Sequence, residues 1–251
     1  MTVGQLAAFE AFGFLRLGAV FSAREMGDIR REFDDVLEED RDGRRFTGDE
    51  RQIVQSFVER RAALSRLIDD DRIYGPMVQV LGPDLVWLTS DGNLYVGDTD
   101  WHHDATVKGY PQIKVALYLD PVGRDTGCLR VIPGSHTPPY HHTLEPLSAS
   151  DSPGFGVASA DVPCAYLESE PGDVVMFHQT MWHASFGGGA GRRMLALSYA
   201  PYPTTDAHAA YLRSLYAAVV VKGRSREPFL HSGRPRLESV VSRLRALGLE
   251  D

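Results

Sequence analysis

Two histidines and one aspartate have the residue types and spacing of metal ligands. His102 and Asp104 lie two residues apart, so on an extended strand both side chains leave the same face. His183 supplies a third ligand from a much later part of the chain. Two imidazoles and one carboxylate form the facial triad of non-haem Fe(II) oxygenases, which leaves the other side of the metal open for a co-substrate and O2. The pattern therefore points to oxygen chemistry.

Zinc is the alternative metal. A structural zinc site uses four ligands that are often cysteines, but the chain contains only Cys128 and Cys164, far apart in the sequence. These two cysteines give no disulfide framework either. Zinc held by two histidines and one carboxylate is, however, a known hydrolytic set. A zinc-dependent hydrolase or a non-catalytic metal-binding β-barrel protein is thus the second interpretation.

The composition predicts one globular, β-rich domain. The 251 residues are 43% hydrophobic and include 24 Gly and 15 Pro. The net charge of −8 argues against binding to nucleic acid or to anionic membranes, since both need a basic surface. Residues 1–7 lack a signal-peptide pattern, and no apolar run approaches the ~18 residues of a membrane span. We expect a cytoplasmic protein that acts on a small-molecule substrate.

The chain before residue 85 is predicted to be mainly helical. Ser22 and Glu25 form a capping box at the start of an amphipathic helix that runs to about Glu38. The apolar stripe of this helix consists of Met26, Ile29, Phe33 and Val36. The charged run 38–45 is predicted to be a solvated loop. Further helical segments are expected over 59–68 and 71–81.

From residue 85 the hydrophobic period changes to that of strands. The β-prone runs are 85–89, 94–96, 113–119, 128–132, 173–177 and 194–199, separated by Gly, Pro and Asp turns. Short strands separated by turns in this way are typical of a sandwich or jelly roll with helices packed outside it. The stretch 137–163 is the expected long insertion between core strands, either an active-site lid or a plain connection.

An ordered set of motifs in this chain resembles the phytanoyl-CoA dioxygenase family of Fe(II)/2-oxoglutarate-dependent oxygenases. The motifs are WHHD at 101–104, DTGCLRVIPGSH at 125–136, PGDVVMF at 171–177, the His183 segment and the Arg192 strand. The resemblance implies a mainly β fold with flanking helices, namely a cupin-like double-stranded β-helix or jelly roll. It places this core at about 85–201, after a helical part at about 20–82 and before a helical tail at about 205–251, all within a single domain 1–251.

The resemblance also implies roles for individual residues. His102, Asp104 and His183 would bind Fe(II) at the catalytic centre, while His103 would point to the opposite face of its strand unless a bulge reverses it. Arg192 would clamp the far carboxylate of 2-oxoglutarate, because a guanidinium group matches a carboxylate bidentately. The neighbouring residue, Arg193, would face away, although the resemblance leaves the choice between the two arginines open.

Further contacts to 2-oxoglutarate are expected from the same comparison. Ser185 shares the strand face of His183, and Thr99 holds a position where relatives place a polar contact; for both, a hydroxyl that satisfies nearby backbone is the alternative. Asn93, Tyr95 and Lys114 are expected to line the barrel. Gln52 and Gln55 fall where relatives bring contacts from the N-terminal helices. For each of these weaker candidates, a solvated or structural polar role is the alternative.

The implied reaction is hydroxylation of an unactivated C–H bond with release of succinate and CO2. The substrate would be a small molecule, such as a natural-product or metabolic intermediate. Related halogenases lack the carboxylate that Asp104 supplies here, so hydroxylation is favoured over chlorination. Desaturation, epoxidation and cyclisation use the same triad and stay open, as do the oligomeric state and the identity of the substrate.

Overall fold

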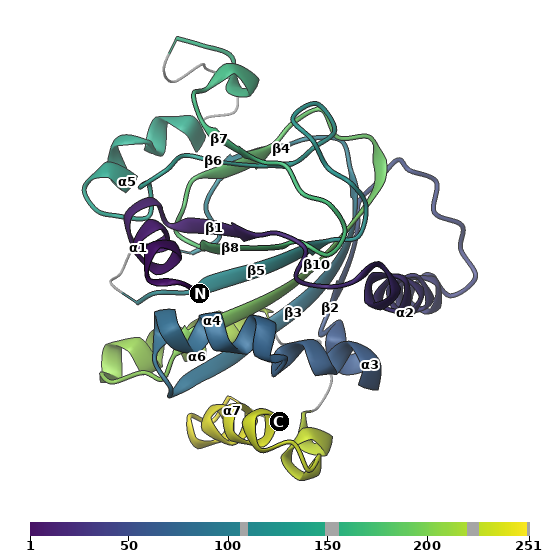
Figure 1. The fold of residues 1–251 in the computed structure, drawn as a ribbon, viewed down its shortest axis with the longest axis vertical. Coiled ribbons are helices and arrows are strands. Elements are labelled where there is room, and N and C mark those ends of the chain that lie inside the picture. Colours follow the sequence, from purple (N-terminus) through teal and green to yellow (C-terminus); the bar gives the residue numbers. More distant parts are fainter. Residues whose placement is uncertain (106–109, 149–155, 220–225, 250–251) are drawn as a thin grey trace.

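Two antiparallel sheets face each other in the computed structural model, which describes residues 1–105, 110–148, 156–219 and 226–249 (Figure 1). The larger sheet has six strands, in the order β1 (Phe14–Leu17), β8 (Val174–His178), β5 (Ile113–Tyr118), β10 (Ala190–Pro201), β3 (Leu85–Val96) and β2 (Gln52–Gln55). The smaller sheet has four, in the order β4 (Thr99–His102), β9 (His183–Ser185), β6 (Leu129–Val131) and β7 (Ala165–Leu167). This arrangement is a double-stranded β-helix, so the predicted fold class is confirmed.

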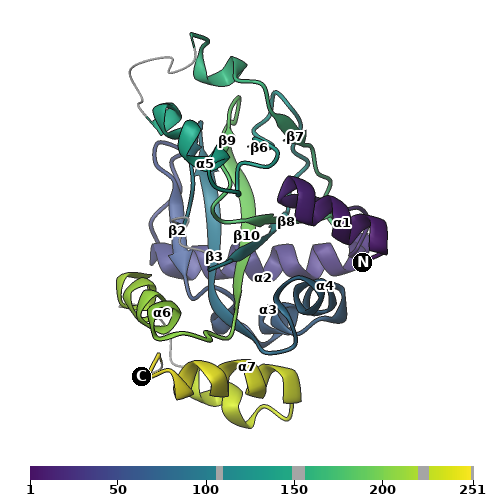
Figure 2. The same ribbon diagram turned by 90° about the vertical axis from the view of Figure 1, so that its left-hand side faces the viewer.

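Most of the helices cover the face of the larger sheet that is turned away from the smaller sheet (Figures 1 and 2). The longer helices are α1 (Val3–Phe12), α2 (Ala23–Arg41), α4 (Asp71–Leu81), α6 (Asp206–Val219) and α7 (Pro235–Ala246), and the short ones are α3 (Ala62–Ser65) and α5 (Tyr140–Thr143). The 3-10 turns are η1 (Val58–Arg60), η2 (Arg66–Ile68), η3 (Glu145–Ser148), η4 (Ser159–Asp161) and η5 (Glu227–His231). None of the described helices is long and apolar enough to cross a membrane.

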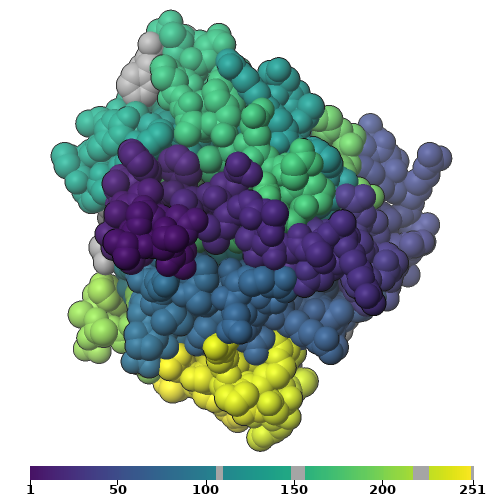
Figure 3. Space-filling model, in the orientation of Figure 1, coloured from purple at the N-terminus to yellow at the C-terminus, as the bar shows by residue number. Residues whose placement is uncertain are grey.

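One hydrophobic core joins the helices to the larger sheet. It combines side chains of α2, α4 and α7 with the outward-facing side chains of β3, β5 and β10. The members of this core extend in sequence from Phe9 to Val241. The space-filling view shows the N-terminal segment in purple crossing the middle of the molecule, where β1 forms one edge of the larger sheet (Figure 3). The shared core supports the proposal of a single domain.

Helix α2 begins as predicted and ends later than predicted. The Ser22 hydroxyl accepts from the backbone N–H of Glu25, and the Glu25 carboxylate accepts from the backbone N–H of Ser22. All four predicted stripe residues are buried. The helix continues to Arg41, so the prediction of a loop over 38–45 was wrong for its first part. Glu and Arg are good helix formers, and Asp42 ends the helix in the left-handed conformation.

The N-terminal helices differ from the prediction in two further places. Helix α1 was not predicted, although Thr2 and Gln5 form a capping box before it. The segment 59–68 was predicted as one helical stretch, but the structure divides it into η1, α3 and η2. By contrast, α4 has the predicted bounds, and Asp70 caps its first turn. Short segments packed between longer elements take their conformation from tertiary contacts rather than from local pattern.

Strand β3 is continuous where the sequence suggested two separate runs. It pairs with β10 along almost its whole length. Gly92 lies within this strand. Only glycine fits there, because a Cβ atom would come within 2.2 Å of the Phe57 ring. The glycine therefore permits close packing within the strand instead of marking a turn.

The insertion between β6 and β7 covers the outer side of the smaller sheet (Figure 1). It contains α5, η3 and η4, and residues 149–155 lie outside the described part of the chain. The indole N–H of Trp101 donates to the Ser159 carbonyl at 2.8 Å, and that of Trp182 donates to the His141 carbonyl at 3.0 Å. With Leu144, these side chains form part of a separate apolar cluster. The insertion thus packs closely behind the strands that carry the predicted ligands.

Candidate metal and co-substrate site

The three predicted metal ligands meet at one end of the smaller sheet. Strands β4 and β9 pair so that His102 lies opposite His183, and Asp104 follows two residues after His102. One ligand atom from each residue lies within 4.8 Å of the other two. The Asp104 carboxylate oxygens are 3.7 Å from Nε2 of either histidine. These separations exceed a hydrogen bond and are suited to three ligands that surround one ion.

The backbone orients both imidazole rings toward this shared point. Nδ1 of His102 lies 2.8 Å from the Asp100 carbonyl oxygen, and Nδ1 of His183 lies 2.9 Å from the Met181 carbonyl oxygen. A carbonyl oxygen only accepts, so each Nδ1 carries the proton and each Nε2 keeps its lone pair. Both rings therefore present a free Nε2 to the space beside Asp104.

The surroundings of the triad keep Asp104 and His183 in the protonation states that can bind a metal ion. Burial opposes ionisation of Asp104, but Lys114 and His183 more than offset it and hold the pKa of this carboxyl below its usual range. The Lys114 ammonium donates to Asp104 at 2.6 Å. Burial lowers the pKa of His183 to about 4, so its ring is neutral near pH 7. Near pH 7, Asp104 is thus an ionised carboxylate and His183 is a neutral imidazole.

His103 is turned away from the triad, as expected. Its Nδ1 lies 3.1 Å from the Ala105 carbonyl oxygen, and its ring packs against Trp182 at a centroid distance of 5.0 Å. The pairing of β4 with β9 does contain an irregularity between Thr99 and His102. This bulge lies before the ligand pair and leaves the alternation of His102 and His103 intact.

Arg192 extends into the interior from β10 and is incompletely hydrogen bonded. Its Nη2 donates to the Ser185 hydroxyl at 3.1 Å, and this hydroxyl donates to the Gly127 carbonyl at 2.9 Å. Its Nε and Nη1 are buried without a hydrogen-bond partner. A Cβ atom at Gly127 or at Gly188 would lie within 2.0 Å of Nη1, so only glycine fits beside this group. Two directed N–H groups are therefore available to an anionic ligand.

Arg193 has the opposite environment. Its Nε donates to Asp34 of α2 at 2.7 Å, and its Nη1 donates to Asp120 at 3.0 Å. Both carboxylates lie on the helix-covered side of the larger sheet, so the guanidinium group of Arg193 is already paired. Of the two adjacent arginines, only Arg192 faces the cavity.

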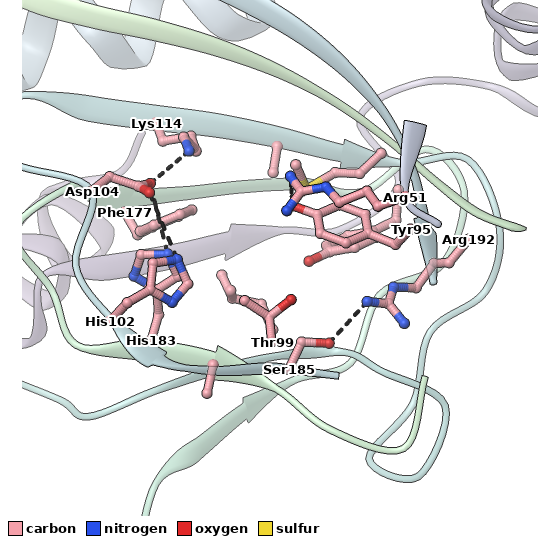
Figure 4. Close-up of a pocket in the computed structure, with 15 residues that line it drawn as sticks. Arg51, Tyr95, Thr99, His102, Asp104, Lys114, Phe177, His183, Ser185 and Arg192 are labelled. Carbon is pink, nitrogen blue, oxygen red and sulfur yellow. Dashed lines mark hydrogen bonds and ion pairs between the residues drawn. The ribbon is translucent and has the colours of Figure 1, made fainter. Parts of the chain in front are cut away.

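One cavity connects the triad to Arg192, with the triad at one end and Arg192 at the other (Figure 4). Its volume is about 110 Å³. The predicted residues that line it are Tyr95, Thr99, His102, Asp104, Lys114, His183, Ser185 and Arg192. The smaller sheet supplies Thr99 and Ser185, which pair across β4 and β9.

Three other predicted positions do not line this cavity. Asn93 is fully buried and accepts hydrogen bonds from Arg51 instead. Gln52 donates to the Leu37 carbonyl at 3.0 Å and so faces α2. Gln55 is exposed on the same edge strand. The expectation that Asn93 lines the cavity was wrong. Gln52 and Gln55 are three residues apart on β2 and so face opposite sides of the strand. Gln52 has a structural role against α2 and Gln55 is solvated, which is the alternative that the sequence left open for both.

Several cavity residues were missed in the sequence. They are Arg51, Ala116, Tyr118, Leu129, Phe177, Ala184 and Met194. The two-residue period could have identified Ala116 and Tyr118 from Lys114, and Met194 from Arg192, since alternate residues of a strand share a face. Nothing local marks Arg51, which precedes β2 and reaches the site only through the pairing of β2 with β3.

The model of the phytanoyl-CoA dioxygenase (PhyH) family matches residues 9–194 of the chain. The chain belongs to the phytanoyl-CoA dioxygenase family. This assignment covers the helical N-terminal part, both sheets, the triad and Arg192. Comparison with curated proteins gives no significant match. The family and the jelly-roll fold together support the general class of Fe(II)/2-oxoglutarate-dependent oxygenases.

Solved structures with the same fold include a complex with hygromycin B and two enzymes from nogalamycin biosynthesis. HygX from Streptomyces hygroscopicus with nickel and 2-oxoglutarate bound is 19% identical, with a TM-score of 0.65 over 80% of this chain and 87% of that chain; another structure of HygX also contains hygromycin B. The 2-oxoglutarate-dependent carbocyclase SnoK from nogalamycin biosynthesis is 20% identical, with a TM-score of 0.62 over 84% and 90% of the two chains. The epimerase SnoN from the same biosynthesis is 18% identical, with a TM-score of 0.62 over 84% and 87%.

Proposed function

We propose that this protein is an Fe(II)- and 2-oxoglutarate-dependent dioxygenase that hydroxylates an unactivated C–H bond of a small molecule and releases succinate and CO2. The observation that carries the proposal is the pairing, in one cavity, of a two-histidine, one-carboxylate cluster with a buried arginine that has two unpartnered N–H groups. A hydrolytic zinc site has no need for the second feature.

The residues present fit both proposed groups. Two imidazole nitrogens and one carboxylate are the donor set that suits Fe(II) with open positions. At the other end of the cavity, the unpartnered N–H groups of Arg192 are the donors that a carboxylate of 2-oxoglutarate needs. Bound together, iron and 2-oxoglutarate supply the activation of O2 that oxidation of a C–H bond requires.

The chain contributes orientation, charge and exclusion of water. His102, Asp104 and His183 would hold the metal on one face, while Arg192 and Ser185 would fix the far carboxylate of 2-oxoglutarate by charge-assisted hydrogen bonds. Thr99 and Tyr95 line the space between these two ends.

The substrate class is proposed to be natural-product or metabolic intermediates. HygX has been solved with hygromycin B, and SnoK and SnoN serve nogalamycin biosynthesis. Because a carbocyclase and an epimerase share this fold, the reaction outcome depends on how the substrate is placed in the cavity. We also propose that the chain forms a single domain, that the protein is cytoplasmic, and that O2 is the second co-substrate.

The proposal is tested by aerobic incubation of purified protein with Fe(II), 2-oxoglutarate and a panel of such intermediates. Succinate formation and a product heavier than the substrate by one oxygen atom are expected for hydroxylation. A product lighter by two hydrogen atoms would indicate desaturation or cyclisation. If zinc-loaded protein hydrolysed a substrate while iron-loaded protein formed no succinate, the dioxygenase assignment would be refuted.

A further inference from the structure

Arg51 is a second arginine of the cavity, and we infer that it binds an oxyanion, a carboxylate or phosphate group, carried by the primary substrate. The inference rests on the proposed function, because it takes the metal and Arg192 to be the binding partners of 2-oxoglutarate. Arg51 precedes β2, and its side chain reaches over β3 into the cavity (Figure 4). The residue would determine which substrates the enzyme accepts.

The Arg51 guanidinium group is held in place by two residues of β3. Its Nε and Nη2 donate to the Asn93 side-chain oxygen at 3.2 and 2.7 Å, and Nη2 also donates to the Tyr95 hydroxyl at 2.9 Å. The group stacks on the Tyr95 ring with its carbon 3.8 Å from the centroid. An arginine with this many restraints is preorganised, so it loses little conformational entropy when a ligand binds.

A third residue sets the orientation of this support. The Asn93 amide nitrogen donates to the Asp91 carboxylate, which leaves the amide oxygen directed at Arg51. The carboxylate is therefore engaged by the amide and forms no ion pair with Arg51 within the described residues. Nearby Arg60 and Arg61, in contrast, both pair with acidic residues of α2. Arg51 is thus an exposed cation beside the cavity that no carboxylate contacts directly within the described residues, while Asp91 acts on it through space from behind Asn93.

The other cations of the cavity have assigned partners, so Arg51 is the one that can bind a charged group of the substrate. Lys114 is matched by Asp104. 2-Oxoglutarate carries two carboxylates, of which one is assigned to the metal and the other to Arg192. The Tyr95 ring lies between Arg51 and Arg192, whose guanidinium carbon is 5.0 Å from the ring centroid (Figure 4). An anion that contacts Arg51 directly would therefore come from another molecule, and the primary substrate is the one that enters this space.

Carboxylate and phosphate groups share the chemistry that Arg51 offers. Both accept hydrogen bonds from Nη1, the donor atom of Arg51 that the contacts to Asn93 and Tyr95 leave unused, and both are attracted by the permanent charge of the guanidinium group. An uncharged analogue of such a substrate would leave Arg51 without a partner. Recognition by a directed charged group discriminates more strongly than the fit of an apolar pocket.

The test uses the anaerobic complex of the protein with Fe(II) and 2-oxoglutarate, identified by its visible charge-transfer band, and inorganic phosphate and acetate as probes. Calorimetry should show saturable binding of at least one probe to the wild-type complex. We expect Arg51→Gln to weaken that binding at least tenfold and to change the 2-oxoglutarate half-saturation concentration less than threefold. Arg51→Lys should lose most of the binding as well. Arg45→Gln, which removes an exposed arginine of the preceding loop, should behave as wild type.

The outcomes separate this inference from the proposed function. Stronger binding of phosphate assigns a phosphorylated substrate, and stronger binding of acetate assigns a carboxylated one. A rise of the 2-oxoglutarate half-saturation in Arg51→Gln as large as in Arg192→Gln would make Arg51 a co-substrate residue and overturn the inference alone. Equal probe binding in wild type and Arg51→Gln, or no binding to the wild-type complex, would also overturn it.

A wild-type protein without the charge-transfer band would overturn the proposed function itself, before the role of Arg51 is tested. Thermal unfolding of Arg51→Gln and Arg51→Lys checks that both variants fold.

Discussion

Arg192 and Arg193 are neighbours in the chain with opposite surroundings. Arg192 ends in the cavity with two unpartnered N–H groups, while Arg193 is bound by Asp34 and Asp120 on the helix-covered side of the sheet. Strand alternation alone predicts that only one of the two enters the barrel. The identity of that residue depends on the register of β10, which pairs Arg192 with Tyr95 of β3.

Replacing Arg192 should selectively weaken the binding of 2-oxoglutarate. Arg192→Gln removes a charged, buried donor pair, a loss of about 2 to 4 kcal/mol, so the dissociation constant should rise roughly 30- to 1000-fold. Calorimetry of the metal-loaded protein measures this change. Arg193→Gln is the matched control and should leave the dissociation constant unchanged. Similar values for the two variants would remove Arg192 from the proposed role.

At the scale of single elements, the register of β4 with β9 positions both ends of the site. It places His102 opposite His183 and Thr99 opposite Ser185. A shift of β4 by one residue against β9 would turn Thr99 and His102 to the other face and separate them from His183 and Ser185. The continuous strands β3 and β10 form the opposite wall and carry Tyr95 and Arg192.

The continuity of β3 depends on Gly92. In Gly92→Ala, the added methyl group would overlap the Phe57 ring, and overpacking of this kind costs about 1 to 3 kcal/mol. Urea unfolding should show that loss. Gly75→Ala in α4 is the control, because nothing lies within 4 Å of its added atom, and the free energy of unfolding should stay the same or rise. An unchanged free energy for Gly92→Ala would contradict the packing.

Strand β8 ends in a half-buried histidine that should make the stability depend on pH. Burial lowers the pKa of His178 to about 3, from an ordinary value of 6.5. The unfolded chain therefore binds this proton first, so the stabilisation by the neutral ring is complete above about pH 6.5 and is lost as the pH falls toward 3. The loss should be at most about 1.4 kcal/mol per pH unit.

The histidine can be tested by substitution. His178 stacks between Phe9 and His136, with ring centroids 5.1 and 4.6 Å away, so phenylalanine is a suitable replacement. We expect the free energy of unfolding of His178→Phe to fall less between pH 7.5 and pH 5 than that of wild type. An identical slope in the two proteins would show that His178 does not cause the dependence.

At the scale of the whole molecule, the C-terminal segment is joined to the barrel by a buried ion pair. Arg226 and Glu59 are 3.1 Å apart with side chains that are 3% and 1% exposed. Arg226 also donates to the carbonyls of Trp87 and Leu88 and stacks on the Trp87 ring. The pair links residues 167 positions apart in sequence.

Removal of one member of this pair should destabilise the fold strongly. Arg226→Met leaves the Glu59 charge buried and uncompensated, and such changes cost about 3 to 5 kcal/mol. Chemical denaturation gives the value. The double variant Glu59→Met with Arg226→Met should recover a large part of the loss, because no buried charge remains. If the double variant were less stable than Arg226→Met alone, the role of the uncompensated charge would be wrong.

The sequence predicted those features that depend on local pattern or on spacing along one strand. The jelly roll follows from short strand-period runs between turns, and the three ligands follow from their spacing and motif order. Arg51 could not be predicted, because it reaches Asn93 across 42 residues of sequence. The Glu59–Arg226 pair could not be predicted either, because it joins residues that are 167 positions apart in sequence. Such contacts exist only once the sheets and helices are assembled, whereas period and capping act within a single element.

The most direct test of the proposed site is an anaerobic titration of the protein with Fe(II) and then with 2-oxoglutarate, followed by visible absorption. Wild type should develop a weak metal-to-ligand charge-transfer band. His183→Ala should show none, and Arg192→Gln should reach the same band only at much higher 2-oxoglutarate concentration. A wild type without the band, or a band of equal strength in His183→Ala, would contradict the assignment of this cavity as an iron and 2-oxoglutarate site.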